Sequence, residues 1–314
     1  MHAVTIVDKE LEWREHDDPV PGTGELLVEV RAAGLNSGDL LQRAGFYPAP
    51  PGSPADIPGL EAAGEVVALG DGVADFAVGD RVMAVIGGGG QAERFVVHER
   101  CALRVPDSMG WAEAGGFAEA FTTAHDALFS QAGLGLGEHL CVHGAAGGVG
   151  VAAVQLGVAT GARVTATVRN EALRDRVAEL GAQVVDPEGF EQHGPFDVVL
   201  ELIGASNLPA DLTSLATGGR ICVIGVGGGG FRAEVDLLAL MSRRARIHGS
   251  TLRARPLEQK ALAAAAVARH VLPLVEEGRV RVSVAETFPL RDAASAYDRF
   301  RAGGKFGKIV LVAD

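Results

Sequence analysis

A glycine-rich turn lies between a short apolar run and a helix-forming segment near the middle of the chain. Residues 139–170 read HLCVHGAAGGVGVAAVQLGVATGARVTATVRN, and Gly144, Gly147 and Gly150 recur at every third position. Glycine lets the backbone approach a pyrophosphate closely, and the free N–H groups at the start of a helix over 149–160 would face the phosphates. The segment therefore predicts a dinucleotide site. The residues expected to hold it are Ala145, Gly147, Gly148, Val149 and Gly150.

The elements around the turn strengthen this prediction, because the turn itself departs from the usual G-x-G-x-x-G pattern. Ala145 stands where the first glycine is usual. A β-type run precedes the turn, and a second strand over 163–168 closes a unit of about thirty residues. A glycine-rich hairpin turn is the alternative, but it would not need the helix. A phosphoryl-transfer loop is excluded, because no Gly-Lys-Ser/Thr follows the turn.

The end of the second strand indicates which dinucleotide is bound. NAD-preferring sites place a carboxylate there, which would repel a 2′-phosphate. This chain has Val168 there, and Arg169, Asn170 and Arg174 follow it. Charged hydrogen bonds from such groups contribute about 1.5 to 3 kcal/mol each, so the sequence predicts NADPH. Two alternatives remain: Arg169 is a solvated residue ahead of a helix, or Glu171 turns back to the ribose and NADH is tolerated.

The elements that must position these residues suggest two domains in 314 residues. Short β-type runs at 26–33, 63–69, 81–86 and 93–97 predict a small barrel-like domain. From residue 118 onward helices and strands alternate, which predicts an α/β domain with a doubly wound parallel sheet. The expected elements there are helices 118–131, 171–180 and 257–277 and strands 198–202, 220–226 and 246–250. The tail, from about residue 283, returns to strand, helix and strand and is expected to pack back onto the first domain.

Composition narrows the class of protein. The net charge of −12 and the pI near 5.2 argue against nucleic acid or an anionic membrane as a partner. The uncharged stretch 140–160 fits a buried strand, turn and helix better than a membrane span, and no secretory signal is visible, so a cytoplasmic protein is expected. The three cysteines, Cys101, Cys141 and Cys222, show no disulfide or metal spacing.

Short segments along the whole chain carry a resemblance to a known family. They are Ala33-Gly34-Leu35-Asn36, Asp39-Leu40-Leu41-Gln42-Arg43, Gly45-Phe46-Tyr47-Pro48, Pro50-Pro51-Gly52, Gly59-Leu60-Glu61-Ala62-Ala63-Gly64, Gly88-Gly89-Gly90-Gln91-Ala92, the turn 145–150 and Gly307-Lys308-Ile309-Val310-Leu311. In these the chain resembles a zinc-independent quinone oxidoreductase of the medium-chain dehydrogenase/reductase superfamily, of the p53-inducible and zeta-crystallin-like branch.

The resemblance implies an architecture and an assembly. A GroES-like, β-rich catalytic domain, residues 1–117 and 283–314, would surround a Rossmann domain, residues 118–282, that binds NADPH. A homodimer or a pair of dimers is implied as well. The turn 227–230 with Phe231 and Arg232 is a candidate border of a dimer strand at the sheet edge, although turns of this type also occur in monomers. The stretch 186–196 is shorter than relatives usually carry, which suggests that an outer helix is missing.

The residues argue against a catalytic metal. Zinc relatives use two cysteines and a histidine, whereas here Asn36 takes the position of the first cysteine and Leu60 that of the histidine. The lobe that holds a second zinc in relatives is replaced by the glycines of 87–90. His139 and His143 are interpreted as packed or capping residues. Polarising a carbonyl then depends on hydrogen-bond donors, which favours electron-poor acceptors.

Quinones and α,β-unsaturated carbonyls are such acceptors. The resemblance places Asn36 and Tyr47 in the substrate cleft, with Tyr47 as a donor to the developing oxyanion, and Thr123 near the nicotinamide. The alternative for Tyr47 is a ring that packs on the loop 48–51. Asp39 and Gln42 are expected to hold the loop. Further cofactor contacts are implied at Gly225, Ser250, Arg255 and Lys308, with an exposed strand lysine as the alternative for Lys308.

Three functions remain open. The first is an NADPH-dependent reductase of quinones or enones, by a two-electron or a one-electron route. The second is a zinc-free enoyl-thioester reductase, whose long anionic substrates call for a basic approach that Lys9, Arg14 and Arg43 support little. The third is a non-enzymatic NADPH-binding scaffold.

Overall fold

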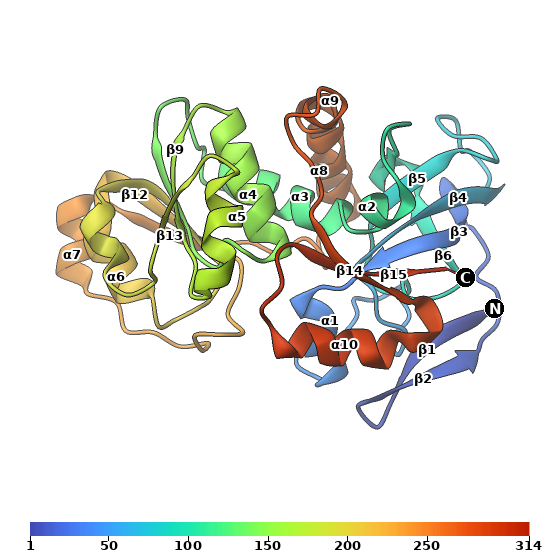
Figure 1. The fold of residues 1–314 in the computed structure, drawn as a ribbon. Helices are drawn as coiled ribbons and strands as arrows, with labels where there is room; N and C mark the ends of the chain where they lie inside the picture. Colours follow the sequence, from blue (N-terminus) through green and yellow to red (C-terminus); the bar gives the residue numbers. More distant parts are fainter. Residues whose placement is uncertain (314) are drawn as a thin grey trace. The chain divides into compact units, whose positions relative to one another are not determined.

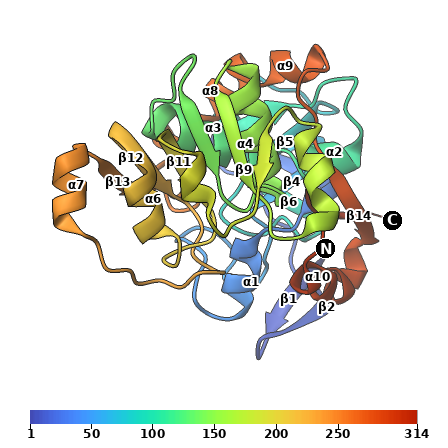
Figure 2. The same cartoon turned by 60° about the vertical axis from the view of Figure 1, so that its left-hand side comes forward.

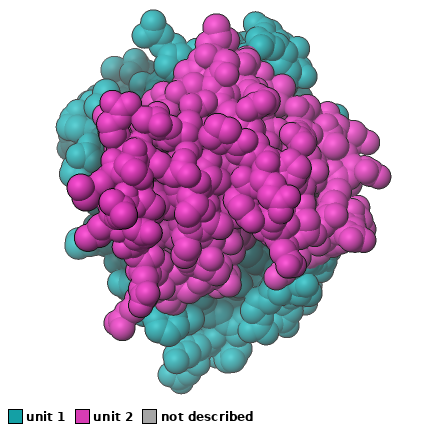
Figure 3. All heavy atoms as spheres, turned by 90° about the vertical axis from the view of Figure 1, so that its left-hand side faces the viewer, with its two compact units in different colours: residues 1–122, 252–303, 308–314 teal, residues 123–251, 304–307 magenta. Residues whose placement is uncertain are grey.

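A computed structural model describes residues 1–313, which form two compact units (Figure 3). The first unit consists of residues 1–122, 252–303 and the residues after 307, and the second of residues 123–251 and 304–307. These units differ from the predicted domain boundaries, because residues 252–282 belong to the first unit. The helix α3 (Ala118–His125) and the π-helical turn Asp126–Gln131 carry the chain from the first unit into the second.

The second unit is built on a six-stranded sheet in which every neighbouring pair is parallel (Figures 1 and 2). Its strands, in spatial order, are β10 (Gln183–Val185), β9 (Arg163–Thr167), β8 (His139–Val142), β11 (Phe196–Glu201), β12 (Leu215–Val223) and β13 (Arg246–Gly249). The strand order reverses between β8 and β11, and ligands of open α/β sheets bind at such a switch point, beyond the carboxyl ends of the strands. The predicted doubly wound parallel sheet is confirmed.

Helices connect these strands on both faces of the sheet. The chain steps from β8 to β10 in one direction and from β11 to β13 in the other, so right-handed crossovers place the two sets of helices on opposite faces. The helices are α4 (Gly148–Ala159), α5 (Arg174–Ala178), α6 (Leu208–Ser214) and α7 (Leu237–Arg243), with 3₁₀ turns at Glu171–Leu173 and Phe190–His193. The 3₁₀ turn Phe190–His193 lies where the sequence suggests a missing helix.

Burial on both faces explains the composition of the central strands. All four residues of β8 are buried, and the core joins Cys141, Phe196, Val199, Leu215 and Ile221. A strand covered on both faces gains from near-continuous apolar residues.

The first unit is rich in antiparallel strands. The hairpin of β1 (His2–Val7) and β2 (Glu10–Glu15) accompanies a seven-stranded sheet. The strands of that sheet are β14 (Val284–Pro289), β15 (Lys308–Val312), β3 (Glu25–Gly34), β4 (Glu61–Leu69), β5 (Arg81–Val85), β7 (Ala102–Arg104) and β6 (Arg94–His98), the last paired with β3. Leu26, Val28 and Val30 of β3 alternate into the core, as a half-buried strand requires. Val310 pairs with Gly34, so the tail packs onto this unit as predicted.

Short helices complete the first unit. They are α1 (Ser37–Arg43), α2 (Trp111–Gly115), α8 (Leu257–His270), α9 (Leu272–Glu276) and α10 (Ala293–Ala302), with 3₁₀ turns at Glu99–Cys101 and Leu290–Asp292. The predicted single helix 257–277 is divided, because Pro273 lacks an N–H and begins a new helix after Val271. No helix within residues 1–313 combines the length and the apolar character that crossing a bilayer requires.

Candidate functional site

The glycine turn of the second unit has the backbone that an anion site needs. It leaves β8 through Gly144, whose φ is +63°, and α4 begins at Gly148 with Gly147 as its N-cap. A Cβ on Gly150 would lie 2.4 Å from the carbonyl oxygen of Gly144 and 2.7 Å from the Cα of Ala145, so the helix packs directly on the turn. A Cβ on Gly147 would meet only that carbonyl oxygen, at 3.4 Å. Gly150 therefore serves packing, whereas the space beside Gly147 is open to a ligand.

A segment from the end of the chain also contacts this turn. The N–H of Gly307 donates to the carbonyl oxygen of Ala146 at 2.8 Å, and Gly307 forms a parallel bridge with Gly147. Phe306 is buried beside it, with the Arg176 guanidinium 4.2 Å from its ring centroid. Sequence reasoning did not place 304–307 at the turn, because no local pattern reports a contact between residues so far apart in the chain.

The residues after β9 do not all remain available to a phosphate. Arg174 donates from Nε to the carbonyl oxygen of Val168 at 3.0 Å and pairs with Asp186, and Glu171 lies 3.8 Å from its Nη1. Arg174 is thus paired with Asp186 in this structure, and its contact with a 2′-phosphate stays a prediction. Arg169 is exposed and forms no ion pair with another described residue.

Asn170 and Glu171 are placed by the 3₁₀ turn that follows β9. Asn170 Oδ1 accepts from the N–H of Ala172 at 3.1 Å, which leaves the side-chain amide N–H₂ for other partners. Glu171 is exposed and lies 3.8 Å from Arg174 Nη1, and whether it turns toward a ribose stays a prediction. Arg169 and Asn170 are thus the polar groups left at this strand end.

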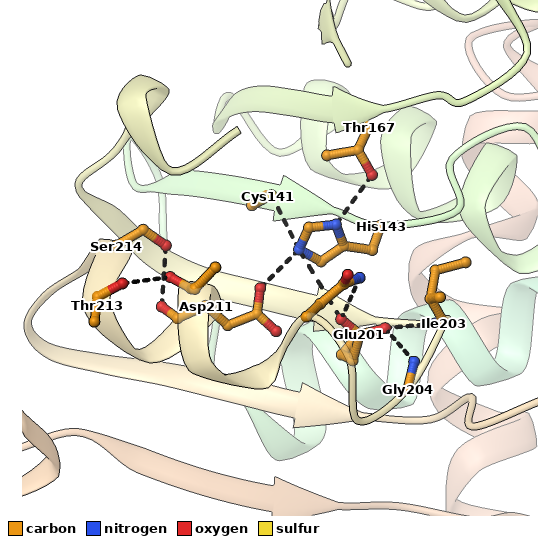
Figure 4. Close-up of polar contacts among 11 residues, drawn as sticks. Cys141, His143, Thr167, Glu201, Ile203, Gly204, Asp211, Thr213 and Ser214 are labelled. Carbon is orange, nitrogen blue, oxygen red and sulfur yellow. Dashed lines mark hydrogen bonds and ion pairs between the residues drawn. The ribbon is translucent and has the colours of Figure 1, made fainter. Parts of the chain in front are cut away.

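Beneath the turn lies a buried polar cluster that the sequence analysis missed (Figure 4). His143 Nε2 lies 2.8 Å from Asp211 Oδ1 on α6 and 4.0 Å from Glu201 Oε2 at the end of β11. Its Nδ1 lies 3.0 Å from Thr167 Oγ1 on β9, and Cys141 Sγ is 3.8 Å from Nε2. The cluster joins three strands and a helix at the carboxyl edge of the sheet. The expectation that His143 is packed holds, but it omitted the two carboxylates.

Glu201 connects this cluster to the loops that follow two strands. Its Oε1 accepts from the N–H groups of Ile203 and Gly204, and its backbone carbonyl accepts from Ile224 and Gly225. A Cβ on Gly225 would lie 2.2 Å from the carbonyl oxygen of Leu202, so the two loops are in direct contact. Gly225, a predicted cofactor residue, is therefore held in place by Glu201.

The surroundings raise the pKa values of two groups in this cluster, His143 and Glu201. His143, Glu201 and Asp211 each offer one ligand atom within 4.8 Å of the others, a grouping that could hold a metal ion. Burial opposes the charged imidazole, yet Cys141 and the hydrogen bond to Asp211 hold the pKa of His143 well above its ordinary value. Burial raises the pKa of Glu201. The raised pKa of His143 favours its imidazolium form, which lies 2.8 Å from Asp211 and 4.0 Å from Glu201.

In the first unit the side chain of Lys308 contacts Asn36. Lys308 Nζ lies 2.6 Å from Glu61 Oε1, and it donates to Asn36 Oδ1 at 2.6 Å and to the carbonyl oxygen of Leu35 at 2.8 Å. Asn36 Nδ2 donates to Glu61 Oε1 at 3.0 Å. Lys308 is 4% exposed and its three N–H donors are used here. The expected reach of Lys308 to a phosphate is therefore corrected, as is the alternative of an exposed lysine.

These residues do not fit a catalytic zinc. Asn36 and Leu60 stand at two ligand positions, and the Leu60 side chain is buried and has no donor atom. The Lys308 ammonium already supplies a positive charge against Glu61, and it would repel a metal ion placed beside Asn36.

Tyr47 is half-buried next to a guanidinium. Arg253 Nη1 donates to the carbonyl oxygen of Tyr47 at 2.7 Å, and the guanidinium carbon Cζ of Arg253 lies 4.9 Å from the centroid of the tyrosine ring. Within residues 1–313 the Tyr47 hydroxyl has no hydrogen-bond partner. Burial raises the pKa of this hydroxyl, as does Glu119, so it keeps its proton at neutral pH.

The loop residues act as predicted. Asp39 accepts from the N–H groups of Asn36, at 2.8 Å, and Gly59, at 3.1 Å, and Gln42 Nε2 donates to the carbonyl oxygen of Ala55. The structural role predicted for Asp39 and Gln42 is confirmed.

The remaining predicted residues are divided between the units. Thr123 is buried at the start of the second unit, and Ser250, in the same unit, donates to Asp126 Oδ2 at 2.9 Å. Arg255 belongs to the first unit, where it lines a cavity. The roles of these three residues stay predictions.

Comparisons with known proteins agree with this fold. The alcohol dehydrogenase GroES-like domain family matches residues 22–132, and the zinc-binding dehydrogenase family matches residues 175–311. A quinone oxidoreductase of Rattus norvegicus is 30% identical over 306 residues, which cover 94% of this chain and 91% of the relative. Polyketide synthase GfsB of Streptomyces halstedii is 34% identical over 294 residues, which cover 92% of this chain but 5% of the synthase.

A solved structure gives the same result. A mycobacterial protein complexed with NADPH superposes with a TM-score of 0.87 at 27% sequence identity, covering 99% of this chain and 100% of that one. The predicted combination of a Rossmann sheet with a GroES-like domain is thereby confirmed. The chain belongs to the medium-chain dehydrogenase/reductase superfamily of oxidoreductases, in the family that includes the quinone oxidoreductases.

Proposed function

We propose that this protein uses NADPH to reduce quinones or α,β-unsaturated carbonyls without a metal ion. The observation that carries the proposal is the set of Asn36, Glu61 and Lys308, in which a buried ammonium pairs with Glu61 and leaves no place for a metal ion beside Asn36. An acceptor must then be electron-poor enough to be reduced with hydrogen-bond donors alone. The 30% identity to a quinone oxidoreductase supports this class of acceptor.

The cofactor proposal rests on the glycine turn and on Arg169. The backbone of residues 145–150 would hold the pyrophosphate at the start of α4, and Arg169 and Asn170 would hold the 2′-phosphate. The similarity to a protein complexed with NADPH supports the same cofactor.

Arg169→Ala tests the cofactor proposal. We expect the KM for NADPH to rise about tenfold to a hundredfold, the equivalent of one charged hydrogen bond, and the KM for NADH to stay within about twofold. Arg301→Ala removes an exposed arginine of the first unit and serves as the matched control. An unchanged KM for NADPH would remove Arg169 from the site.

In the reaction, NADPH supplies a hydride to the acceptor. Tyr47 would donate a hydrogen bond from its protonated hydroxyl to the oxygen on which negative charge develops. Asn36 would shape the cleft, held by Glu61 and Lys308. Thr123 is proposed to line the nicotinamide side.

The acceptor class is tested with the purified protein and Tyr47→Phe. NADPH oxidation is followed with 1,2-naphthoquinone, 1,4-benzoquinone, an alkenal and crotonyl-CoA, and an electron-spin-resonance signal of a semiquinone separates the one-electron route. We expect Tyr47→Phe to lower kcat about a hundredfold, within the range for loss of one oxyanion donor, without changing the melting temperature. Unchanged kcat would exclude Tyr47 as the donor.

An enoyl-thioester reductase is the second candidate, favoured by the similarity to a segment of a polyketide synthase. It requires the same hydride step. Turnover of crotonyl-CoA with a kcat/KM above that of every quinone would make it the preferred function.

A homodimer is part of the proposal. Phe231, Leu237, Leu238 and Met241 are each at least 66% exposed, on α7 and the segment before it, and β13 is an edge strand of the same unit. An apolar surface next to an open strand edge favours a second copy as its partner. Light scattering should give twice the chain mass, and Leu238→Glu should give the monomer.

A further inference from the structure

A cavity of about 570 Å³ lies within the first unit. Its walls include the loop 50–54, the glycine turn 87–89, the strand β6, Cys101 and the segment 253–255 that leads into α8. Small-molecule sites usually measure about 300 to 1,000 Å³, so the cavity is large enough for an aromatic molecule. The glycine turn closes one wall at short range, because a Cβ on Gly87 would lie 2.1 Å from Ser53 Oγ.

The charged groups on this cavity are mainly basic. Arg253 is 4% exposed and donates to the carbonyl oxygens of Gly87 and Tyr47, both at 2.7 Å, and to Gln42 Oε1 at 2.6 Å. It forms no ion pair with a carboxylate of the described residues, and at most three of its five N–H donors are used.

Lys260 adds a second positive charge on the same cavity. It projects from the first turns of α8 and, like Arg253, has no ion-pair partner within residues 1–313. Arg94 is already paired with Asp18, and the acidic residue on the wall, Glu25, accepts from the N–H of Gly22. In a protein of net charge −12, this concentration of unpaired positive charge is a local exception.

The rest of the wall is apolar, with Ile57, Ile86 and Cys101 buried around the cavity. Arg253 links the cavity to the proposed reaction site, because the same guanidinium contacts Tyr47. An apolar wall with unpaired cations is complementary to an aromatic body that carries an anionic group.

We propose that the cavity binds an anionic substituent of the acceptor, so that the preferred substrates are electron-poor carbonyl compounds that carry a carboxylate. The proposal rests on the reductase function proposed above and adds the charge of the substrate to it. Lys260 and Arg253 are the residues that would contact the carboxylate.

A matched pair of acceptors tests the proposal with the full chain and NADPH. The pair is 3-(1,4-naphthoquinon-2-yl)propanoate and its methyl ester, which share the quinone and differ in charge. We expect the carboxylate to have a KM about tenfold below that of the ester, the equivalent of one charged hydrogen bond. Lys260→Gln should raise the KM of the carboxylate alone, and Lys260→Arg should restore it. Arg269→Gln, an exposed charge on the same helix, is the control that should preserve the preference.

Equal KM values for the two acceptors, or an unchanged preference in Lys260→Gln, would overturn the proposal. If neither quinone is reduced, the proposed function fails, and the cavity is then tested by calorimetry with 2-naphthoate and methyl 2-naphthoate. Tighter binding of the carboxylate by the wild type than by Lys260→Gln would support the cavity assignment. Equal binding would refute it.

Discussion

Replacing Lys308 should reveal whether this residue stabilises the fold or binds the cofactor. The Lys308 ammonium is 2.6 Å from Glu61 Oε1, and both side chains are at most 5% exposed. Lys308→Met fills similar space but leaves the Glu61 carboxylate buried without its cation. Breaking a buried pair by removing one partner costs about 3 to 5 kcal/mol, so we expect the free energy of unfolding to fall by that amount.

The magnitude depends on what remains around Glu61. Its carboxylate would keep the hydrogen bonds from Asn36 Nδ2, at 3.0 Å, and from the N–H of Glu119, at 2.7 Å, but these donors are neutral. Lys308→Met combined with Glu61→Gln removes both charges, so the double variant should be more stable than Lys308→Met alone.

Urea unfolding followed by far-UV circular dichroism measures these differences, and NADPH affinity is measured in parallel by fluorescence titration. The structure predicts a large loss of stability for Lys308→Met with NADPH affinity changed less than about threefold. The reasoning is wrong if Lys308→Met costs under about 1 kcal/mol, or if the double variant is less stable than the single one. A tenfold loss of NADPH affinity at unchanged stability would indicate instead that Lys308 binds the phosphates of the cofactor.

Three further predictions concern buried groups in the two units. Burial raises the pKa of Asp39 to about 6, which is above its value in the unfolded chain. Because the unfolded chain releases this proton more easily, the free energy of unfolding should fall by up to about 3 kcal/mol as the pH rises from 4 to 6. Asp39→Asn should remove this component of the pH profile. Gly150→Ala should lower the melting temperature by several degrees, because its Cβ would meet the backbone of the turn. Gly147→Ala should leave the melting temperature unchanged and raise the KM for NADPH. The reverse pattern would contradict the assigned roles. His143→Gln leaves Asp211 without its cation and should cost about 3 kcal/mol in urea unfolding, and a cost below about 1 kcal/mol would mean that the cluster is not charged.

Local sequence patterns were sufficient for the parallel sheet and the glycine turn. The strand β8, the turn and α4 form one continuous segment, so apolar runs and glycine spacing report them directly. The alternation of β3 was equally readable. The hairpin of β1 and β2 was not predicted, because its turn uses Asp8 and Lys9 at φ of +49° and +69° in place of the usual Asn-Gly or Asp-Gly.

The side-chain partners of charged residues could not be predicted from local sequence patterns. Arg174 was predicted to face a phosphate, but it forms an ion pair with Asp186, which lies twelve positions later in the chain. Lys308 lies beside Glu61 because β15 pairs with β3, a contact between the two ends of the chain. Asp211 and Glu201 lie on different elements from His143, and a single histidine beside a glycine turn gives no signal of either carboxylate. In each case tertiary pairing decided the role of a charge that spacing alone had left open.

The buried lysine also limits the chemistry that the first unit can perform. A zinc ion can exchange a ligand for a substrate oxygen, whereas the Lys308 ammonium has all three donors engaged by Leu35, Asn36 and Glu61. It therefore offers no open position to an acceptor, and it stabilises Asn36 and Glu61 where they are. In the proposed reaction, activation of the acceptor would come from a donor that is not already bonded, and the Tyr47 hydroxyl, which has no hydrogen-bond partner within residues 1–313, meets that condition. Because Arg253 contacts both Tyr47 and the basic cavity, a carboxylate bound in that cavity would also reduce the positive potential at Tyr47 and keep its hydroxyl protonated.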